Sequence, residues 1–164
     1  MKTRTPLFAA LALLAGLSAA FAPAAQAETL ACPDLATAVQ VGNCPTEDEL
    51  LFTYDGFCSD NARIYRKDAS VCTDFLLYRK MKNVVLWESA DGAFQTYLSC
   101  DLPTAAITAA KPRGIAVARE GSMTRLVCTY GDGIAFTHRT KATCRTQGDG
   151  DCGADPAACK ASCD

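Results

Sequence analysis

The chain of 164 residues contains ten cysteines, and all ten lie between positions 32 and 163. An even, dense set of this kind is typical of a disulfide framework in an oxidising compartment. Spacing alone does not give the pairing, because ten cysteines can pair in very many ways. We therefore predict that every cysteine forms a structural disulfide: Cys32, Cys44, Cys58, Cys72, Cys100, Cys128, Cys144, Cys152, Cys159 and Cys163.

The N-terminus has the pattern of a secretory signal peptide. Lys2 and Arg4 precede an apolar run over residues 7–21, and Ala25-Gln26-Ala27 offers the small residues that a signal peptidase reads. This run of about 15 residues is shorter than the ~20 that a transmembrane helix needs, and no later stretch is as long. We expect cleavage after Ala27, a periplasmic or extracellular protein, and no transmembrane segment.

A lipoprotein reading of the same region is the alternative. Residues 29–32, Thr-Leu-Ala-Cys, faintly resemble a box in which the cysteine is lipidated. Glu28 separates this box from the apolar run, and Thr29 is a poor fit to its first position. Lipidation of Cys32 would also leave nine cysteines, an odd number, in an oxidising compartment. These observations favour simple secretion.

Charge excludes one class of partner. Removal of Lys2 and Arg4 leaves 14 of the 16 basic residues against 18 acidic ones, a formal net charge of −4. Nucleic-acid binding requires a clear basic excess on one face, so we expect no nucleic-acid partner.

We expect one β-rich domain over residues 28–146, followed by a Gly, Asp and Cys-rich tail over residues 147–164. The tail has three cysteines, which cannot all pair among themselves, so at least one of them must form a disulfide with a cysteine of the domain. The tail has no large apolar residue, so we expect the rest of it to be solvated.

Strand patterns dominate the second half of the chain. Residues 84–88 and 93–100 flank Asp91-Gly92 as a hairpin, and residues 115–119 and 124–130 flank a second turn. Gly131-Asp132-Gly133 then leads into a fifth strand over 134–139. The predicted fold is α+β and mostly antiparallel β, a meander of about five strands with short helices.

Helical signals are short. A helix from Thr104 that ends before Pro112 is expected between the hairpins. Residues 33–39 suggest a brief helix with Leu35 and Val39 inward, and residues 44–49 resemble a helix start. Strand and loop remain alternatives for both. In residues 70–81 the spacing of the apolar residues fits a helix as well as a strand.

Chemistry-bearing motifs are sparse. His138 is the only histidine, no cysteine pair has the two-residue spacing of a redox or zinc motif, and no Gly-x-Ser-x-Gly elbow occurs. Asp149 and Asp151 suggest a calcium loop only weakly, because the EF-hand glycine and glutamate are missing. We predict no catalytic residue, metal site or cofactor. A small envelope hydrolase that uses Glu88 and Asp91 as a carboxylate pair is the alternative.

Aromatic and cationic residues alternate in the middle of this acidic chain. Arginine and tyrosine are frequent anchors of protein interfaces, and such a patch fits an acidic partner. The predicted binding residues are Arg63, Tyr65, Arg66, Tyr78, Arg79 and Lys80. We therefore expect a secreted or periplasmic non-catalytic protein that binds or inhibits another protein, such as a toxin or an envelope enzyme. A structural component that pairs through a sheet edge is a further alternative.

Overall fold

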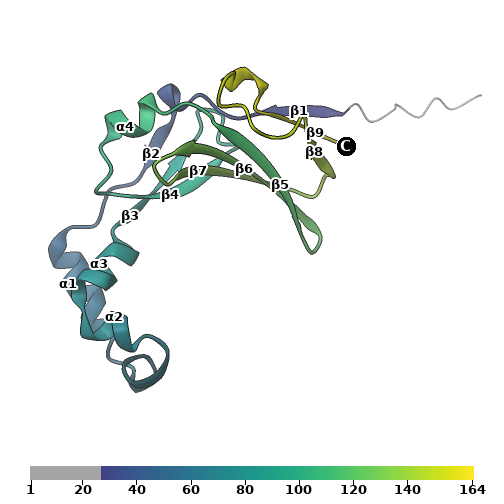
Figure 1. The fold of residues 1–164 in the computed structure, drawn as a ribbon. Helices are drawn as coiled ribbons and strands as arrows, with labels where there is room; N and C mark the ends of the chain where they lie inside the picture. The colour runs from purple at the N-terminus through teal and green to yellow at the C-terminus, as the bar shows by residue number, and fades with distance from the viewer. Residues whose placement is uncertain (1–26) are drawn as a thin grey trace, which may run out of the picture.

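The computed structural model describes residues 27–164, so the expected signal peptide, Ala27 apart, lies outside the described residues. Two antiparallel sheets form the body of the protein, and a group of helices projects from one end of it (Figure 1). This is a disulfide-rich α+β fold, which confirms the predicted class. Within residues 27–164, no helix combines the length and apolarity needed to cross a membrane.

The larger sheet has six strands. In spatial order they are β2 (Val39–Val41), β3 (Val84–Glu88), β4 (Gln95–Ser99), β7 (Ile134–Thr140), β6 (Met123–Gly131) and β5 (Gly114–Glu120). All five strands expected over residues 84–139 are present. Their order departs from a simple meander in one place, because β4 pairs with β7 and leaves β5 at the edge. The long connection through α4 (Thr104–Ala109) allows this, since it carries the chain away from β4 before β5 begins.

The smaller sheet corrects the expectation of a solvated tail. Its order is β1 (Glu28–Ala31), β9 (Lys160–Cys163) and β8 (Cys144–Thr146), so the end of the chain forms the central strand. Ala161 and Cys163 are buried there. Small residues and cysteines suffice because β1 and β8 supply the backbone partners on both sides.

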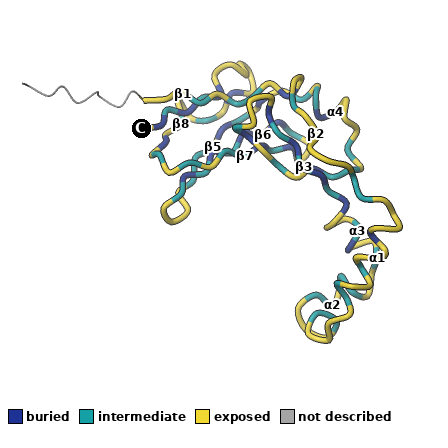
Figure 2. The backbone as a smooth tube through the Cα atoms, turned by 180° about the vertical axis from the view of Figure 1, so that it is seen from behind, coloured by how far each residue is buried: buried dark blue, intermediate teal, exposed yellow. Residues whose placement is uncertain are grey.

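The core lies between the six-stranded sheet and a layer on one side of it. Strand alternation points Trp87, Leu126 and Phe136 into this core. The covering layer consists of the short 3-10 helix η1 (Leu35–Thr37), α4 and the smaller sheet, with Leu35 and Ile107 fully buried beneath it. Figure 2 shows this buried centre in dark blue. Residues on the opposite face of the sheet are exposed or only half-buried.

The N-terminal expectations are met in part. Leu35 points inward as predicted, but Val39 belongs to edge strand β2 and is 51% exposed. The expected helix between the hairpins is α4, which begins at Thr104 with Pro103 rather than Thr104 in the capping position. Another 3-10 turn, η3 (Pro156–Ala158), lies within the C-terminal segment.

All ten cysteines are paired, as predicted. The disulfides are Cys32–Cys128, Cys44–Cys100, Cys58–Cys72, Cys144–Cys163 and Cys152–Cys159. Cys144–Cys163 is the bond that clips the C-terminal segment to the domain. Because the sulfur of Cys32 is bonded to that of Cys128, the thiol that lipidation would need is already used.

Candidate binding site

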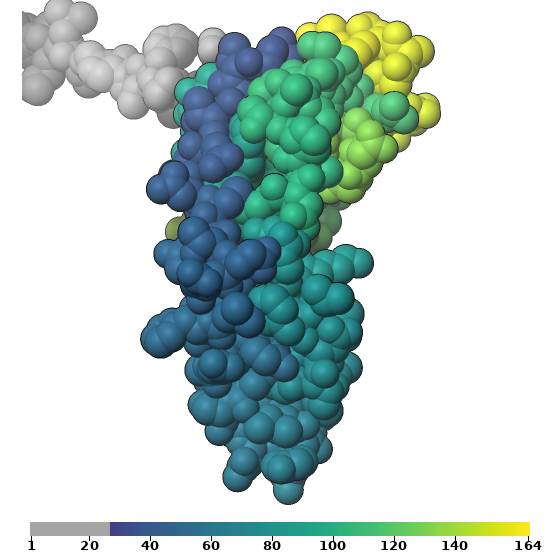
Figure 3. Space-filling view, turned by 90° about the vertical axis from the view of Figure 1, so that its left-hand side faces the viewer, coloured from purple at the N-terminus to yellow at the C-terminus, as the bar shows by residue number. Residues whose placement is uncertain are grey.

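Residues 46–82 form a projection that we call the helical arm. It contains α1 (Glu47–Phe57), the π-helical turn η2 (Arg63–Lys67), α2 (Ala69–Thr73) and α3 (Phe75–Lys82). Figure 3 shows the arm as a narrow extension of the body, in blue and teal. Residues 70–81, which the sequence pattern left unassigned, are thus largely helical.

Local sequence explains where α1 begins. Thr46 and Glu49 form a capping box, in which Glu49 N–H donates to Thr46 Oγ1 at 3.2 Å and Thr46 N–H donates to Glu49 Oε2 at 2.8 Å. These hydrogen bonds lower the pKa of Glu49, with the backbone bond from Thr46 as the main cause. The helix start is therefore fixed next to the body, at the base of the arm.

The inside of the arm is small and aromatic. Leu50 and Tyr78 are its buried hydrophobic residues, and the ring of Tyr78 lies 5.2 Å from that of Tyr54 and 5.5 Å from that of Phe57. The Tyr54 hydroxyl donates to the carbonyl of Cys72 at 2.7 Å. So few buried residues stabilise the arm only weakly, and the Cys58–Cys72 disulfide supplies a covalent restraint at its far half.

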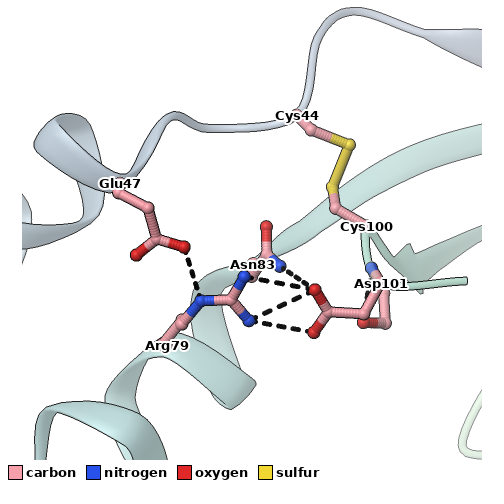
Figure 4. A network of polar contacts seen from close by, with 7 residues as sticks. Cys44, Glu47, Arg79, Asn83, Cys100 and Asp101 are labelled. Carbon is pink, nitrogen blue, oxygen red and sulfur yellow. Dashed lines mark hydrogen bonds and ion pairs between the residues drawn. A yellow bond between two sulfur atoms is a disulfide. The ribbon is translucent and has the colours of Figure 1, made fainter.

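The base of the arm is fixed by an ion-pair network beside a second disulfide (Figure 4). Arg79 Nε donates to Glu47 Oε1 at 2.6 Å. The guanidinium also makes three hydrogen bonds to Asp101: Nη1 donates to Oδ2 at 2.9 Å and to Oδ1 at 3.2 Å, and Nη2 donates to Oδ1 at 3.2 Å. Asn83 also donates to Asp101 Oδ1, at 3.0 Å. These bonds lower the pKa of Asp101, chiefly through Arg79, and raise that of Arg79. The network joins α1 and α3 to the residue that follows Cys100.

The six predicted binding residues all lie on the helical arm, but they have different surroundings. Tyr78 is buried and Arg79 belongs to the base network. Arg63 lies with its guanidinium carbon 4.0 Å from the centre of the Phe57 ring and pairs with Asp68 at 3.4 Å, so it braces the far end. The remaining three, Tyr65, Arg66 and Lys80, are exposed.

Apart from Tyr65, the exposed apolar residues on the arm were missed by sequence reasoning. Phe52 is 80% exposed, Tyr65 76% and Leu76 69%. In the described chain, six of the nine large hydrophobic residues that remain exposed belong to the arm: Leu51, Phe52, Tyr65, Leu76, Leu77 and Met81. The signal in the sequence was the helical spacing of Leu50, Tyr54 and Phe57, which leaves Phe52 on the opposite side, but it is visible only once α1 is known to be a helix.

The alternative carboxylate pair, Glu88 and Asp91, lies at the turn between β3 and β4. Asp91 Oδ1 accepts from the Ser89 hydroxyl at 2.5 Å and from Ala93 N–H at 3.0 Å, so this carboxylate shapes the turn between β3 and β4. Its pKa is lowered, mainly by Ser89, which is opposite to the shift that a general acid requires. Glu88 lies on the outer face of β3, opposite Gln95.

Metal-ligating groups do not gather in the described residues. Within residues 27–164, no three His, Cys, Asp or Glu side chains are placed to hold a metal ion together. His138 Nδ1 lies 2.7 Å from the Ala93 carbonyl oxygen, which accepts its N–H, and the His138 ring lies 5.3 Å from that of Phe94. It therefore supports the end of the β4–β7 contact.

Comparison of the chain with protein-family models, with curated proteins and with solved structures finds no match.

Proposed function

We propose that this is a secreted or periplasmic, non-catalytic binding protein whose helical arm enters a groove or cleft of another protein. The observation that carries the proposal is the concentration of exposed large hydrophobic residues on the arm. Soluble proteins rarely leave such residues grouped in water unless a partner covers them. Inhibition of a toxin or an envelope enzyme would follow where the covered cleft is the partner's active site.

The construction of the arm supports this role. Association costs less when the binding element is already ordered. The Cys44–Cys100 disulfide and the Arg79 network fix the base of the arm to the body, and the Cys58–Cys72 disulfide restrains its far half. Removing an exposed Leu or Phe side chain from water contributes about 1.5–3 kcal/mol when burial is complete. Several such side chains on one preformed element are enough for a specific complex.

Charge indicates the character of the partner. The second half of the arm, from Arg63 to Lys82, has six basic residues against two acidic ones, whereas residues 46–62 carry five acidic residues and no basic one. Arg63 and Arg79 are paired internally, which leaves Arg66, Lys67, Lys80 and Lys82 without an ion pair in the described part of the chain. The proposed partner therefore has an apolar groove that is acidic where it faces this second half, consistent with electrostatic complementarity at interfaces.

The test is capture of a stoichiometric complex by tagged mature protein from the envelope and secreted fractions of the organism that makes it. The arm variant Arg66→Glu, Lys80→Glu is compared with the control Lys141→Glu, Arg145→Glu, which makes the same charge change at exposed positions of the body. A second arm variant, Phe52→Ala, Tyr65→Ala, removes apolar contacts only.

We expect both arm variants to lose the complex and the control to retain it, with all proteins folded by circular dichroism. Retention of the complex by both arm variants would contradict the proposal, and so would the absence of any stoichiometric partner. Arg79 is avoided as a test position because its substitution disturbs the base network and would confuse folding with binding.

A second candidate function has one observation in its favour. Strand β2 is an edge of the larger sheet, and Val39 and Val41 are 51% and 41% exposed there. The other edge is partly closed, since Ile115 N–H on β5 donates to the Gly150 carbonyl at 2.8 Å. Strand addition at β2 by a partner is thus the alternative. A Val41→Lys variant, which places a charge on this edge, would abolish such pairing and leave an arm-mediated complex intact.

A further inference from the structure

A groove of about 540 Å³ lies on the uncovered face of the larger sheet, where β4 meets β7. Its lining includes Leu86, Gln95, Tyr97, Thr137 and Arg139. The groove is distinct from the helical arm and shares no residue with it.

The sheet itself produces this hollow. β3 and β4 pair along five positions, whereas β4 and β7 pair at a single position, Gln95 opposite Thr137. The two strands therefore separate on either side of that pair. Alternation along the strands places Gln95 and Tyr97 of β4 on the same face as Thr137 and Arg139 of β7.

The polar groups of the groove are not used by the fold. Within residues 27–164, the side chains of Gln95, Tyr97, Thr137 and Arg139 make no hydrogen bond or ion pair with protein. Arg119, by contrast, is engaged: it donates to Gly121 O at 3.2 Å and to Thr124 Oγ1 at 2.9 Å. An amide, two hydroxyls and a guanidinium are thus available to a ligand along one line of the sheet.

One end of the groove is cationic. Arg139 lies directly opposite Arg125 of β6, and like charges in opposite positions destabilise a sheet. Glu120 pairs with Arg125 Nη2 at 2.9 Å, but Arg139 has no carboxylate, and Arg125 Nε is buried without a hydrogen-bond partner. Glu88 shares this face but lies opposite Gln95, in line with Thr137 and not with Arg139. The Arg139 end therefore keeps an excess of positive charge, which an anionic ligand would offset.

The other end is aromatic and apolar. Tyr97 is 68% exposed, and it lies opposite Leu86, which in turn lies opposite Val41. Tyr97 lies two residues from Gln95 along the sheet in one direction, and Arg139 lies two residues from Thr137 in the other direction. Because Gln95 and Thr137 are opposite each other, Tyr97 and Arg139 are four residues apart along the strand direction. At about 3.4 Å per residue this is ~13 Å, the length of a short chain of linked sugar rings.

We infer that the groove binds a short acidic saccharide, a glycan whose sugar rings carry a carboxylate. The Tyr97 ring packs on the apolar face of one sugar, Gln95 and Thr137 hydrogen-bond to hydroxyls, and Arg139 pairs with the carboxylate. Neutral hydrogen-bonding groups beside an exposed ring on a sheet face suit a hydroxyl-rich ligand. An extended peptide would instead use a free sheet edge, where backbone groups are open.

The test is an NMR titration of the mature protein with uronic acid trimers of different sugars, each compared with its methyl ester. Amide shifts are followed over β4 and β7, and tri-glutamate serves as an acidic peptide probe. Tyr97→Ala and Arg139→Gln are the groove variants, and Tyr65→Ala and Arg66→Gln make the same changes on the arm, where they leave the groove untouched.

We expect an acid trimer to shift groove amides at millimolar concentration and its methyl ester to bind about tenfold more weakly, the factor set by 1.4 kcal/mol. Tyr97→Ala should abolish binding, Arg139→Gln should remove the preference for acid over ester, and the arm variants should bind like wild type. Absence of groove shifts with every acid trimer would overturn the inference. So would equal binding of acid and ester, binding that survives Tyr97→Ala, or a response to tri-glutamate alone.

Discussion

Arg79 on α3 and Asp101 after β4 form an ion pair in which both terminal nitrogens of the guanidinium donate to the carboxylate, at 2.9 and 3.2 Å. The pair joins the helical arm to the body beside the Cys44–Cys100 disulfide, which ties down the chain two residues before the arm begins. Position and orientation of the arm therefore depend on a covalent restraint and a directional ionic one. Because the proposed function requires a preformed arm, this base is where its structure can be tested.

Replacing Arg79 with Met should loosen the arm without unfolding the body. The variant keeps the apolar stem but removes the hydrogen bonds to Glu47 and Asp101. Amide hydrogen exchange should become faster in α1 and α3 and remain unchanged in β6 and β7. The matched control is Arg66→Met, an exposed arginine outside the base network. If hydrogen exchange became equally faster in the arm and in the sheet, the Arg79 network would not act on the arm alone, and the prediction would be wrong.

Acid should weaken the same junction. The Arg79 guanidinium holds the pKa of the Asp101 carboxyl below its usual value of 3.8. A carboxyl whose folded pKa is lowered contributes stability that is complete above its unfolded pKa and is lost as pH falls through the folded pKa. Arm protection should thus be constant above about pH 4 and decline below it. In Arg79→Met, an NMR titration should find Asp101 nearer its ordinary pKa. Titration of wild-type Asp101 at or above 3.8 would refute this account.

Loss of the Cys58–Cys72 disulfide should affect the far half of the arm. The two cysteines are 14 residues apart, and a loop of about 15 residues contributes ~3 kcal/mol in the chain-entropy treatment. In a Cys58→Ser, Cys72→Ser variant, limited proteolysis should cut first between residues 58 and 72, while the body resists. Unchanged resistance of this segment would mean that its few buried side chains hold it unaided.

A buried hydroxyl links the N-terminal segment to the sheet. Tyr130 is 3% exposed, and its hydroxyl donates to the Pro33 carbonyl at 2.7 Å. Burial raises the pKa of this phenol, so it remains a neutral donor at any ordinary pH. Tyr130→Phe should lower the free energy of unfolding by about 0.5–1.5 kcal/mol, measured by urea denaturation. The exposed Tyr97→Phe is the control and should be neutral; equal effects would mean that the hydroxyl of Tyr130 adds nothing.

Strand patterns were predictable from the sequence because alternation and turn residues are local. The turn at Gly131-Asp132-Gly133, for example, was expected from its composition, and all three residues have positive φ. The partner of β4 was not predictable, since both β5 and β7 satisfy the same alternation and only packing around α4 decides between them. The role of the C-terminal segment was missed for a similar reason: Ala161 becomes central only after β1 and β8 provide its neighbours.

The candidate site was located in part. Aromatic and cationic residues pointed to the segment that forms the second half of the helical arm, but composition could not separate Tyr78, which is buried, from Tyr65, which is exposed. That distinction depends on helical phase, and residues 70–81 fit both periods. The ion pairs of Arg79 span 22 and 32 residues of sequence, so no local pattern indicates them.

The most direct test of the account is hydrogen exchange on the captured complex compared with the free protein. We predict that partner binding slows exchange in α1 and from Arg63 to Lys82, with little change in β6 and β7. Slowed exchange confined to the sheet face or to β2, with the arm unchanged, would contradict the claim that the helical arm is the binding element.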